Sequence, residues 1–139
     1  MNNILLVEDD YLDAMNVQRQ LSKNNIPHTI KVARNGKEAL NLLQSQSPER
    51  MQPLPDVILL DINMPKMNGL EFLKEIRNDN ELRRLKVFIM TTSNEESERT
   101  QAQRLGIDGY IIKPLSFDDF ENKRSSMDSF NLLCDLLKN

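Results

Sequence analysis

The chain has very few of the residues that build disulfides, zinc sites or serine–histidine catalysis. Its 139 residues include one cysteine, one histidine and no tryptophan. The single cysteine, Cys134, excludes an internal disulfide and a multi-cysteine zinc site. The single histidine, His28, argues against multi-histidine metal centres and against serine–histidine catalysis. It follows Pro27 at the start of an apolar segment, where we expect a surface role.

Long apolar runs and a strong charge of either sign are also missing. No apolar stretch approaches the roughly 20 residues of a membrane span, and no basic segment precedes the first apolar run, so we expect a cytoplasmic protein without a membrane partner. The formal net charge of −3, from 18 basic and 21 acidic residues, argues against direct binding of nucleic acid. The length predicts a single domain over residues 1–139, burying roughly 68–70% of its unfolded surface.

Two short apolar runs end in carboxylates. Residues 4–7 lead into Glu8, Asp9 and Asp10, and residues 57–60 lead into Asp61. Continuous apolar runs of this length are typical of strands in a parallel sheet that is covered on both faces. Ligands of such sheets bind beside the carboxyl ends of the strands. The pattern therefore predicts an acidic site at that edge.

Strands and helices alternate along the rest of the chain. We expect strands at about 4–8, 29–33, 57–60, 87–90 and 110–112, with helices at about 10–23, 37–44, 69 onward, 94–105 and 116 onward. Five such repeats predict an α/β, flavodoxin-like (βα)5 doubly wound sandwich, with a five-stranded parallel sheet in the order 2-1-3-4-5. In that order the first and third strands are neighbours, so Glu8, Asp9 and Asp61 converge.

Several side chains have predicted positions within this fold. The strand at 29–33 alternates apolar and polar residues, as an edge strand would. The second helix should bury Leu40 and Leu43, and the polar fourth helix only Ala102 and Leu105. The third helix should bury Gly69, Phe72, Leu73 and Ile76, and the last helix Phe117, Phe120, Met127, Phe130, Leu133, Leu137 and the thiol of Cys134. Residues 45–55, with three prolines, form a long loop that is either a plain surface connection or a partner contact.

The acidic edge predicts a magnesium site. Crowded carboxylates repel one another and ionise together only with a cation among them. Mg²⁺ takes oxygen ligands and is held by one or two carboxylates, for which Asp9 and Asp61 are suited, with Glu8 reaching it through water. An aspartate oxygen can attack phosphorus, and Lys113 and Thr91, at the ends of the fifth and fourth strands, could donate to the oxygens of the transferred group.

Four motifs carry a resemblance to a known family. They are Ile4-Leu5-Leu6-Val7-Glu8-Asp9-Asp10, Leu60-Asp61-Ile62-Asn63-Met64-Pro65-Lys66-Met67-Asn68-Gly69, Met90-Thr91-Thr92 and Gly109-Tyr110-Ile111-Ile112-Lys113-Pro114. With these motifs the chain resembles, over essentially its whole length, the receiver domain of two-component response regulators.

The resemblance implies a role for each of these positions. Asp61 would accept a phosphoryl group from a sensor histidine kinase or a phosphotransfer protein. Glu8 and Asp9 match the acidic pair of the family, and the main-chain carbonyl of Asn63 matches its further metal ligand. Thr91 and Lys113 match the switch hydroxyl and the phosphate-pairing lysine, and Tyr110 the aromatic residue that turns inward. Such a protein is not an enzyme, although it assists its own phosphorylation and dephosphorylation.

The resemblance also suggests how the signal leaves the protein. The surface formed by the fourth helix, the fifth strand and the last helix would change on phosphorylation and could form a homodimer. Because the last helix runs to Asn139, we expect no output domain, and output through a downstream protein target or a phosphorelay. The loop at 45–55 and Thr91-Thr92-Ser93 are similar to those of stand-alone regulators that partner phytochrome-type kinases.

Three alternatives stay open at this point. The chain could be a Mg²⁺-dependent phosphohydrolase with an aspartyl-phosphate intermediate, although Asn63 stands where such enzymes often carry a second aspartate. It could bind FMN, although Glu8-Asp9-Asp10 would repel that ligand. It could also be a pseudo-receiver, a binding module that works without phosphorylation.

Overall fold

The computed structural model describes residues 2–113 and 120–138, with the main chain alone at 120–128. The expected start of the last helix near Ser116 and the expected core positions Phe117, Phe120 and Met127 lie outside the described parts. Across the described residues, no helix combines the length and the apolar character that crossing a membrane needs.

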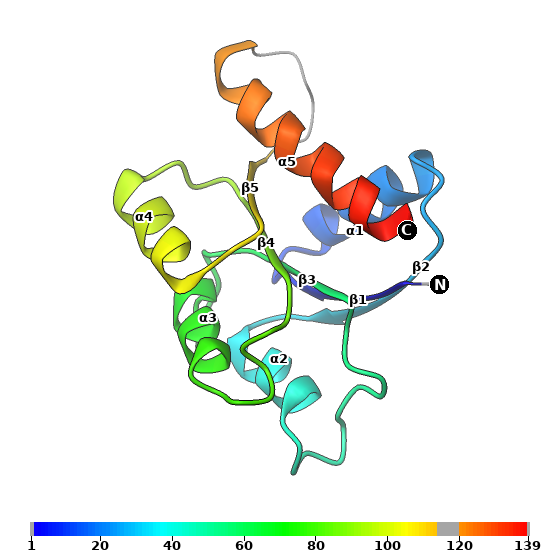
Figure 1. Ribbon diagram of the computed structural model, residues 1–139, viewed down its shortest axis with the longest axis vertical. Coiled ribbons are helices and arrows are strands. Elements are labelled where there is room, and N and C mark those ends of the chain that lie inside the picture. Colours follow the sequence, from blue (N-terminus) through cyan, green and yellow to red (C-terminus); the bar gives the residue numbers. More distant parts are fainter. Residues whose placement is uncertain (1, 114–119, 139) are drawn as a thin grey trace.

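Five parallel strands form the centre of the molecule, and a helix follows each of them (Figure 1). The elements are β1 (Asn2–Val7), α1 (Tyr11–Lys23), β2 (His28–Ala33), α2 (Gly36–Leu43), β3 (Val57–Leu60), α3 (Gly69–Arg77), β4 (Val87–Thr91), α4 (Glu96–Leu105), β5 (Gly109–Ile112) and α5 (Phe120–Lys138). The strand order is β2-β1-β3-β4-β5, and all pairs are parallel. The predicted fold class and strand order are therefore confirmed.

The helices cover both faces of the sheet, as Figure 1 shows. On one face, α2, α3 and α4 pack on Leu5, Val7 and other side chains of the strands. On the opposite face, α1 and α5 pack on Ile4, Leu6 and their neighbours. Successive side chains of a strand point to opposite faces, so each continuous apolar run serves both layers. For this reason every residue of the central strands β3 and β4 is buried.

Most of the predicted core positions are confirmed. The buried residues of α3 are Gly69, Phe72, Leu73 and Ile76, and Cys134 lies buried in the core between α5 and the sheet. In α2, Leu43 is buried as expected. The other buried leucine of this helix is Leu42 and not Leu40, which is only partly buried. In α4 the buried residue is Ala102, and Leu105 is only partly buried.

The loop at 45–55 is anchored to the body of the protein. The Met51 N–H donates to the Leu42 carbonyl at 2.8 Å, and the Arg50 guanidinium donates to the Leu43 carbonyl at 3.1 Å and pairs with Glu81. Met51 and Leu54 pack against the core on the α2–α3 face. These contacts hold the loop against the α2 side of the sheet, away from the carboxyl ends of the strands.

Candidate phosphoryl-acceptor and metal site

Three carboxylates meet at the carboxyl ends of β1 and β3. The two strands pair with Val7 opposite Leu60, and the Asp61 N–H donates to the Val7 carbonyl at 3.0 Å. This register places the residues that follow the strands side by side. Oxygen atoms of Glu8, Asp9 and Asp61 all lie within 4.8 Å of one another. The predicted convergence of these three side chains is confirmed.

The fold strongly affects the ionisation of Glu8. Its side chain is 2% exposed. Burial raises the pKa of Glu8 to about 7, and the charge of Asp61 acts in the same direction, whereas the contact with Lys113 offsets part of the rise. A cation placed among the three carboxylates would relieve this cost. The donor set, three carboxylates with one of them exposed, is also of the kind that Mg²⁺ and similar hard cations take. The residues present therefore fit a divalent metal.

Lys113 provides the positive charge of the site. It follows β5, it is buried, and its ammonium pairs with Glu8, with Asp13 at 3.0 Å and with Asp61 at 3.8 Å. Burial alone would lower the pKa of Lys113, but hydrogen bonds and charges from these acids outweigh burial, so its pKa is raised. The lysine is charged, and it lies within reach of the Asp61 carboxylate.

The segment after Asp61 is held tightly against the end of β3. The Asn63 N–H points back to the Asp61 carboxylate at 3.4 Å, and the Gly69 N–H donates to the Ile62 carbonyl at 2.9 Å. Asn68 and Glu71 form a capping box at the start of α3. These bonds hold the main chain between Asp61 and α3, and the Asn63 N–H contacts the Asp61 carboxylate itself. The metal-ligand role of the Asn63 carbonyl stays a prediction.

Thr91 lies at the carboxyl end of β4, with its side chain buried. Its hydroxyl oxygen accepts a hydrogen bond from the Ser93 N–H at 3.2 Å. Accepting that bond leaves the hydroxyl proton available for another acceptor. Thr91 therefore lies at the same edge of the sheet as Asp61, as its position in the sequence predicts, and its role as a donor stays a prediction.

Tyr110 lies on the edge strand β5. An edge strand could leave this side chain half-exposed, but Tyr110 is buried. Its hydroxyl donates to the Ser93 carbonyl at 3.0 Å, and the Arg99 guanidinium lies 5.0 Å from the ring centre. Burial, followed by the charge of Glu98, raises the pKa of Tyr110. Ser93 also donates its hydroxyl to Glu98 on α4. Ser93 thus connects Thr91, Tyr110 and α4.

Two of these residues, Asp13 and Ser93, were not predicted as part of the site. A signal for Asp13 is present in the sequence, because Asp13, Val17 and Leu21 are spaced by four and share one face of α1. Val17 and Leu21 are buried, so the face that contacts the sheet carries a carboxylate where it reaches the strand ends. Ser93 offers no such signal, since its contacts depend on the path of the β4–α4 loop.

A comparison with protein families gives one match over most of the chain. Residues 4–124 match the model of the response regulator receiver domain. The matched range includes Glu8, Asp61, Thr91 and Lys113, which are buried polar residues at the carboxyl ends of β1, β3, β4 and β5.

Individual proteins and structures agree with that match. The chain is 35% identical over 127 residues to the response regulator Rcp1 of Synechocystis sp., covering 91% of this chain and 86% of Rcp1. The crystal structure of the Mn²⁺-bound form of Rcp1 superposes with a TM-score of 0.76 at 34% identity, covering 98% of this chain and 91% of that one. The phosphorylated cyanobacterial phytochrome response regulator RcpA gives a TM-score of 0.76 at 30% identity, covering 94% and 90%.

Proposed function

This chain belongs to the response regulator receiver domain family, and from that premise we propose that it signals through Mg²⁺-dependent phosphorylation of Asp61. The phosphoryl group would come from a histidine kinase or a phosphotransfer protein. The observation that carries the proposal is the meeting of Asp61 with Lys113, at 3.8 Å, and with the carboxylates of Glu8 and Asp9. A related structure with bound Mn²⁺ and another in its phosphorylated form support both parts of the proposal.

The chemistry needs little more than charge stabilisation by residues that the fold has already placed. A carboxylate oxygen of Asp61 attacks phosphorus, and the bond from phosphorus to the donor breaks in the same transfer. The Lys113 ammonium pairs with the growing negative charge, and the Thr91 hydroxyl donates to a phosphoryl oxygen. A bound Mg²⁺ ion, held by Asp9 and Asp61 with Glu8 behind them, would neutralise part of that charge.

The surface beside Asp61 suits a protein as the phosphoryl donor. Tyr11 and Leu12, in the first turn of α1, are 75% and 73% exposed, and Met15 is exposed one turn later. Exposed apolar side chains gathered in one place mark contact sites for other proteins. Because α1 begins two residues after Asp9, a protein that covers these side chains would also reach the acceptor site.

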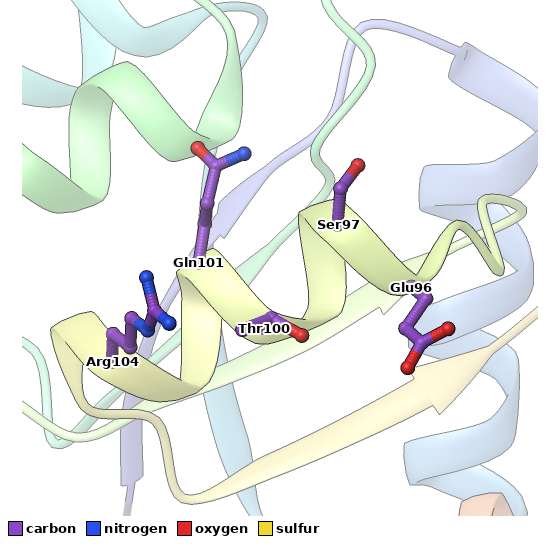
Figure 2. Close-up of a pocket in the computed structure, with 5 residues that line it drawn as sticks. All are labelled: Glu96, Ser97, Thr100, Gln101 and Arg104. Atoms are coloured by element: carbon purple, nitrogen blue, oxygen red, sulfur yellow. The ribbon is translucent and has the colours of Figure 1, made fainter.

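The outer face of α4 suits a second contact, through which the signal would leave. Glu96, Ser97, Thr100, Gln101 and Arg104 line an open, polar hollow of about 470 Å³ along this helix (Figure 2). Acidic residues lie in the first turn of α4 and Arg104 lies in the last. A second copy packed in the opposite direction would pair Glu96 with Arg104 twice, as a two-fold contact requires. We therefore include a homodimer through the α4–β5–α5 surface in the proposal, together with a downstream protein target.

The decisive experiment is the intact mass after incubation with acetyl phosphate, with and without Mg²⁺. Wild type should gain one phosphoryl group only with Mg²⁺, and Asp61→Asn should gain none while remaining folded. Lys113→Ala should still bind Mg²⁺ but should lose the response to phosphorylation. A wild type that gains no phosphoryl group from acetyl phosphate or from a histidine kinase would instead favour a phosphorylation-independent binding module.

The same preparation separates the proposal from an enzyme acting on other substrates. We propose that the protein turns over only its own phosphoryl group, so generic phosphomonoesters should be hydrolysed no faster by wild type than by Asp61→Asn. Hydrolysis that depends on Asp61 would identify a phosphohydrolase.

A further inference from the structure

Lys113 has a partner that the receiver motifs do not include. Its ammonium donates to the Asp13 carboxylate at 3.0 Å, a shorter distance than the 3.8 Å to Asp61. Asp13 lies in the first turn of α1, where its N–H donates to the capping side chain of Asp10 at 3.1 Å. Lys113 therefore ties the end of β5 to the start of α1.

The two acids that hold Lys113 most closely differ in their exposure to water. The side chain of Glu8 is 2% exposed, whereas that of Asp13 is 39% exposed. A buried carboxylate that loses its cation is left without compensation, but a partly exposed one is hydrated instead. If Lys113 has to give up a contact, the contact with Asp13 is the one that costs less to break.

Phosphorylation of Asp61 would require Lys113 to give up one of its contacts. A phosphoryl group brings about −1.5 to −2 charges and three acceptor oxygens to the acceptor side chain. An ammonium group has three N–H donors, and in this structure they face Glu8, Asp13 and Asp61. A new, stronger acceptor on Asp61 therefore competes directly with Asp13.

We propose that Asp13 is a positioning residue that holds Lys113 in the unphosphorylated protein and competes with the phosphoryl group for its ammonium, so that phosphorylation releases α1 from the end of β5. The inference rests on the proposed acceptor function of Asp61. It adds α1, with its exposed Tyr11 and Leu12, to the surfaces that respond to phosphorylation.

The test is the affinity of the full chain for beryllofluoride, a phosphoryl analogue, in the presence of Mg²⁺. Asp13→Asn should bind beryllofluoride about twofold to fivefold more tightly than wild type, the range that a partly exposed ion pair supports. Asp13→Glu should return the affinity toward that of wild type. Glu75→Gln removes one exposed acid from α3 and serves as the control for net charge. An unchanged or weaker affinity for Asp13→Asn, relative to Glu75→Gln, would overturn the inference.

A second readout reports on Lys113 itself. In the protein without beryllofluoride, the NMR signal of the Lys113 ammonium should shift in Asp13→Asn but not in Glu75→Gln, because this ammonium donates to the Asp13 carboxylate. An unchanged signal in Asp13→Asn would contradict the contact. If wild type neither binds beryllofluoride nor accepts a phosphoryl group, the proposed function fails, and this signal still decides whether Asp13 holds Lys113.

Discussion

Gly69, the first residue of α3, lies directly against the main chain of Asp61. A Cβ atom at Gly69 would stand 2.2 Å from the Asp61 carbonyl oxygen and 2.8 Å from the Cα of Ile62. Both contacts are with main-chain atoms, which cannot move aside as the end of a side chain can. The absence of a side chain at Gly69 therefore allows α3 to start close enough to fix the acceptor.

Gly69→Ala should displace the segment after β3 and should weaken both stability and phosphorylation. We expect a loss of roughly 2–4 kcal/mol in the free energy of unfolding, within the range of overpacked sites, measured by urea denaturation. Gly36→Ala is the matched control, since Gly36 is the first residue of α2 but the three atoms nearest to a Cβ there belong to the Met67 side chain and not to the main chain. Equal losses in the two variants would show that the contact with Asp61 has no special importance.

The raised pKa of Glu8 predicts that the metal-free protein loses stability as the pH rises. The pKa of this carboxyl is about 7 in the folded chain and 4.5 ordinarily, so between these values the folded state binds more protons than the unfolded state. Its stabilising contribution is complete below about pH 4.5 and is lost as the pH rises through 7. At about 1.4 kcal/mol per pKa unit, the loss is on the order of 3 kcal/mol.

Urea denaturation from pH 5 to pH 8 in chelator, on wild type and Glu8→Gln, measures this contribution as the difference between the two pH dependences. With Mg²⁺ present the trend should weaken or reverse, because metal ligands bind in their ionised form. Parallel pH dependences for wild type and Glu8→Gln in chelator would contradict the assignment.

Arg77 joins the ends of α3 and α4 through hydrogen bonds to main-chain carbonyls. Its guanidinium donates to the carbonyls of Leu105 at 3.2 Å, of Gly106 at 2.7 Å and 3.1 Å, and of Arg83 and Leu85 at 2.9 Å each. The acceptors at the end of α4 are groups that a helix terminus leaves without partners. Arg77 thus fixes α4 at the end opposite Ser93.

Arg77→Met should cost roughly 2–3 kcal/mol of unfolding free energy, because several carbonyls lose a charged donor at once. Arg77→Lys should recover only part of the loss, since a single ammonium cannot span the separated acceptors. Arg84→Met, at an exposed position of the α3–β4 segment, is the control. Full stability in Arg77→Lys would show that charge near α4, rather than the five-donor geometry, is what matters.

The sequence predicted most accurately the parts of the fold that depend on local patterns. The bounds of β3, 57–60, were predicted correctly because four apolar residues are flanked by acids. The convergence of Glu8, Asp9 and Asp61 followed from the strand order, which fixes which strand ends are neighbours. By contrast, α4 begins at Glu96 and not at residue 94, and its cap residue Glu95 makes no side-chain capping bond. Because the cap residue is not one of the usual capping types, the sequence does not show clearly where this helix begins.

Contacts of a side chain with groups far away in the sequence could not be predicted. The bonds of Arg77 depend on where carbonyls point at the end of a helix 28 residues away. Every residue has a main-chain carbonyl, so the sequence does not show which carbonyls will accept these bonds. The contact of Lys113 with Asp13 spans 100 positions and requires the exact placement of α1 against β5. Such contacts are set by tertiary packing, which the periodicity of a segment does not encode.

The charges at the two ends of α4 predict how a homodimer would respond to charge reversal. Glu96 and Arg104 lie at opposite ends of α4, and both line the open hollow along this helix (Figure 2). In a two-fold contact between antiparallel α4 helices, Glu96→Arg alone or Arg104→Glu alone would place like charges together, and we expect each to weaken dimerisation by about tenfold or more. The double variant restores opposite charges and should dimerise nearly as well as wild type.

Sedimentation velocity of the beryllofluoride-bound protein with Mg²⁺ measures the dimer directly. Glu75→Arg reverses a charge on α3, which is not part of the α4–β5–α5 surface, and should leave the dimer intact. Because each single reversal disrupts both copies of the pair, recovery in the double variant is the outcome that a simple loss of folding cannot produce. A double variant that stays monomeric while wild type dimerises would place the interface on another surface, and a monomeric wild type would remove the homodimer from the proposal.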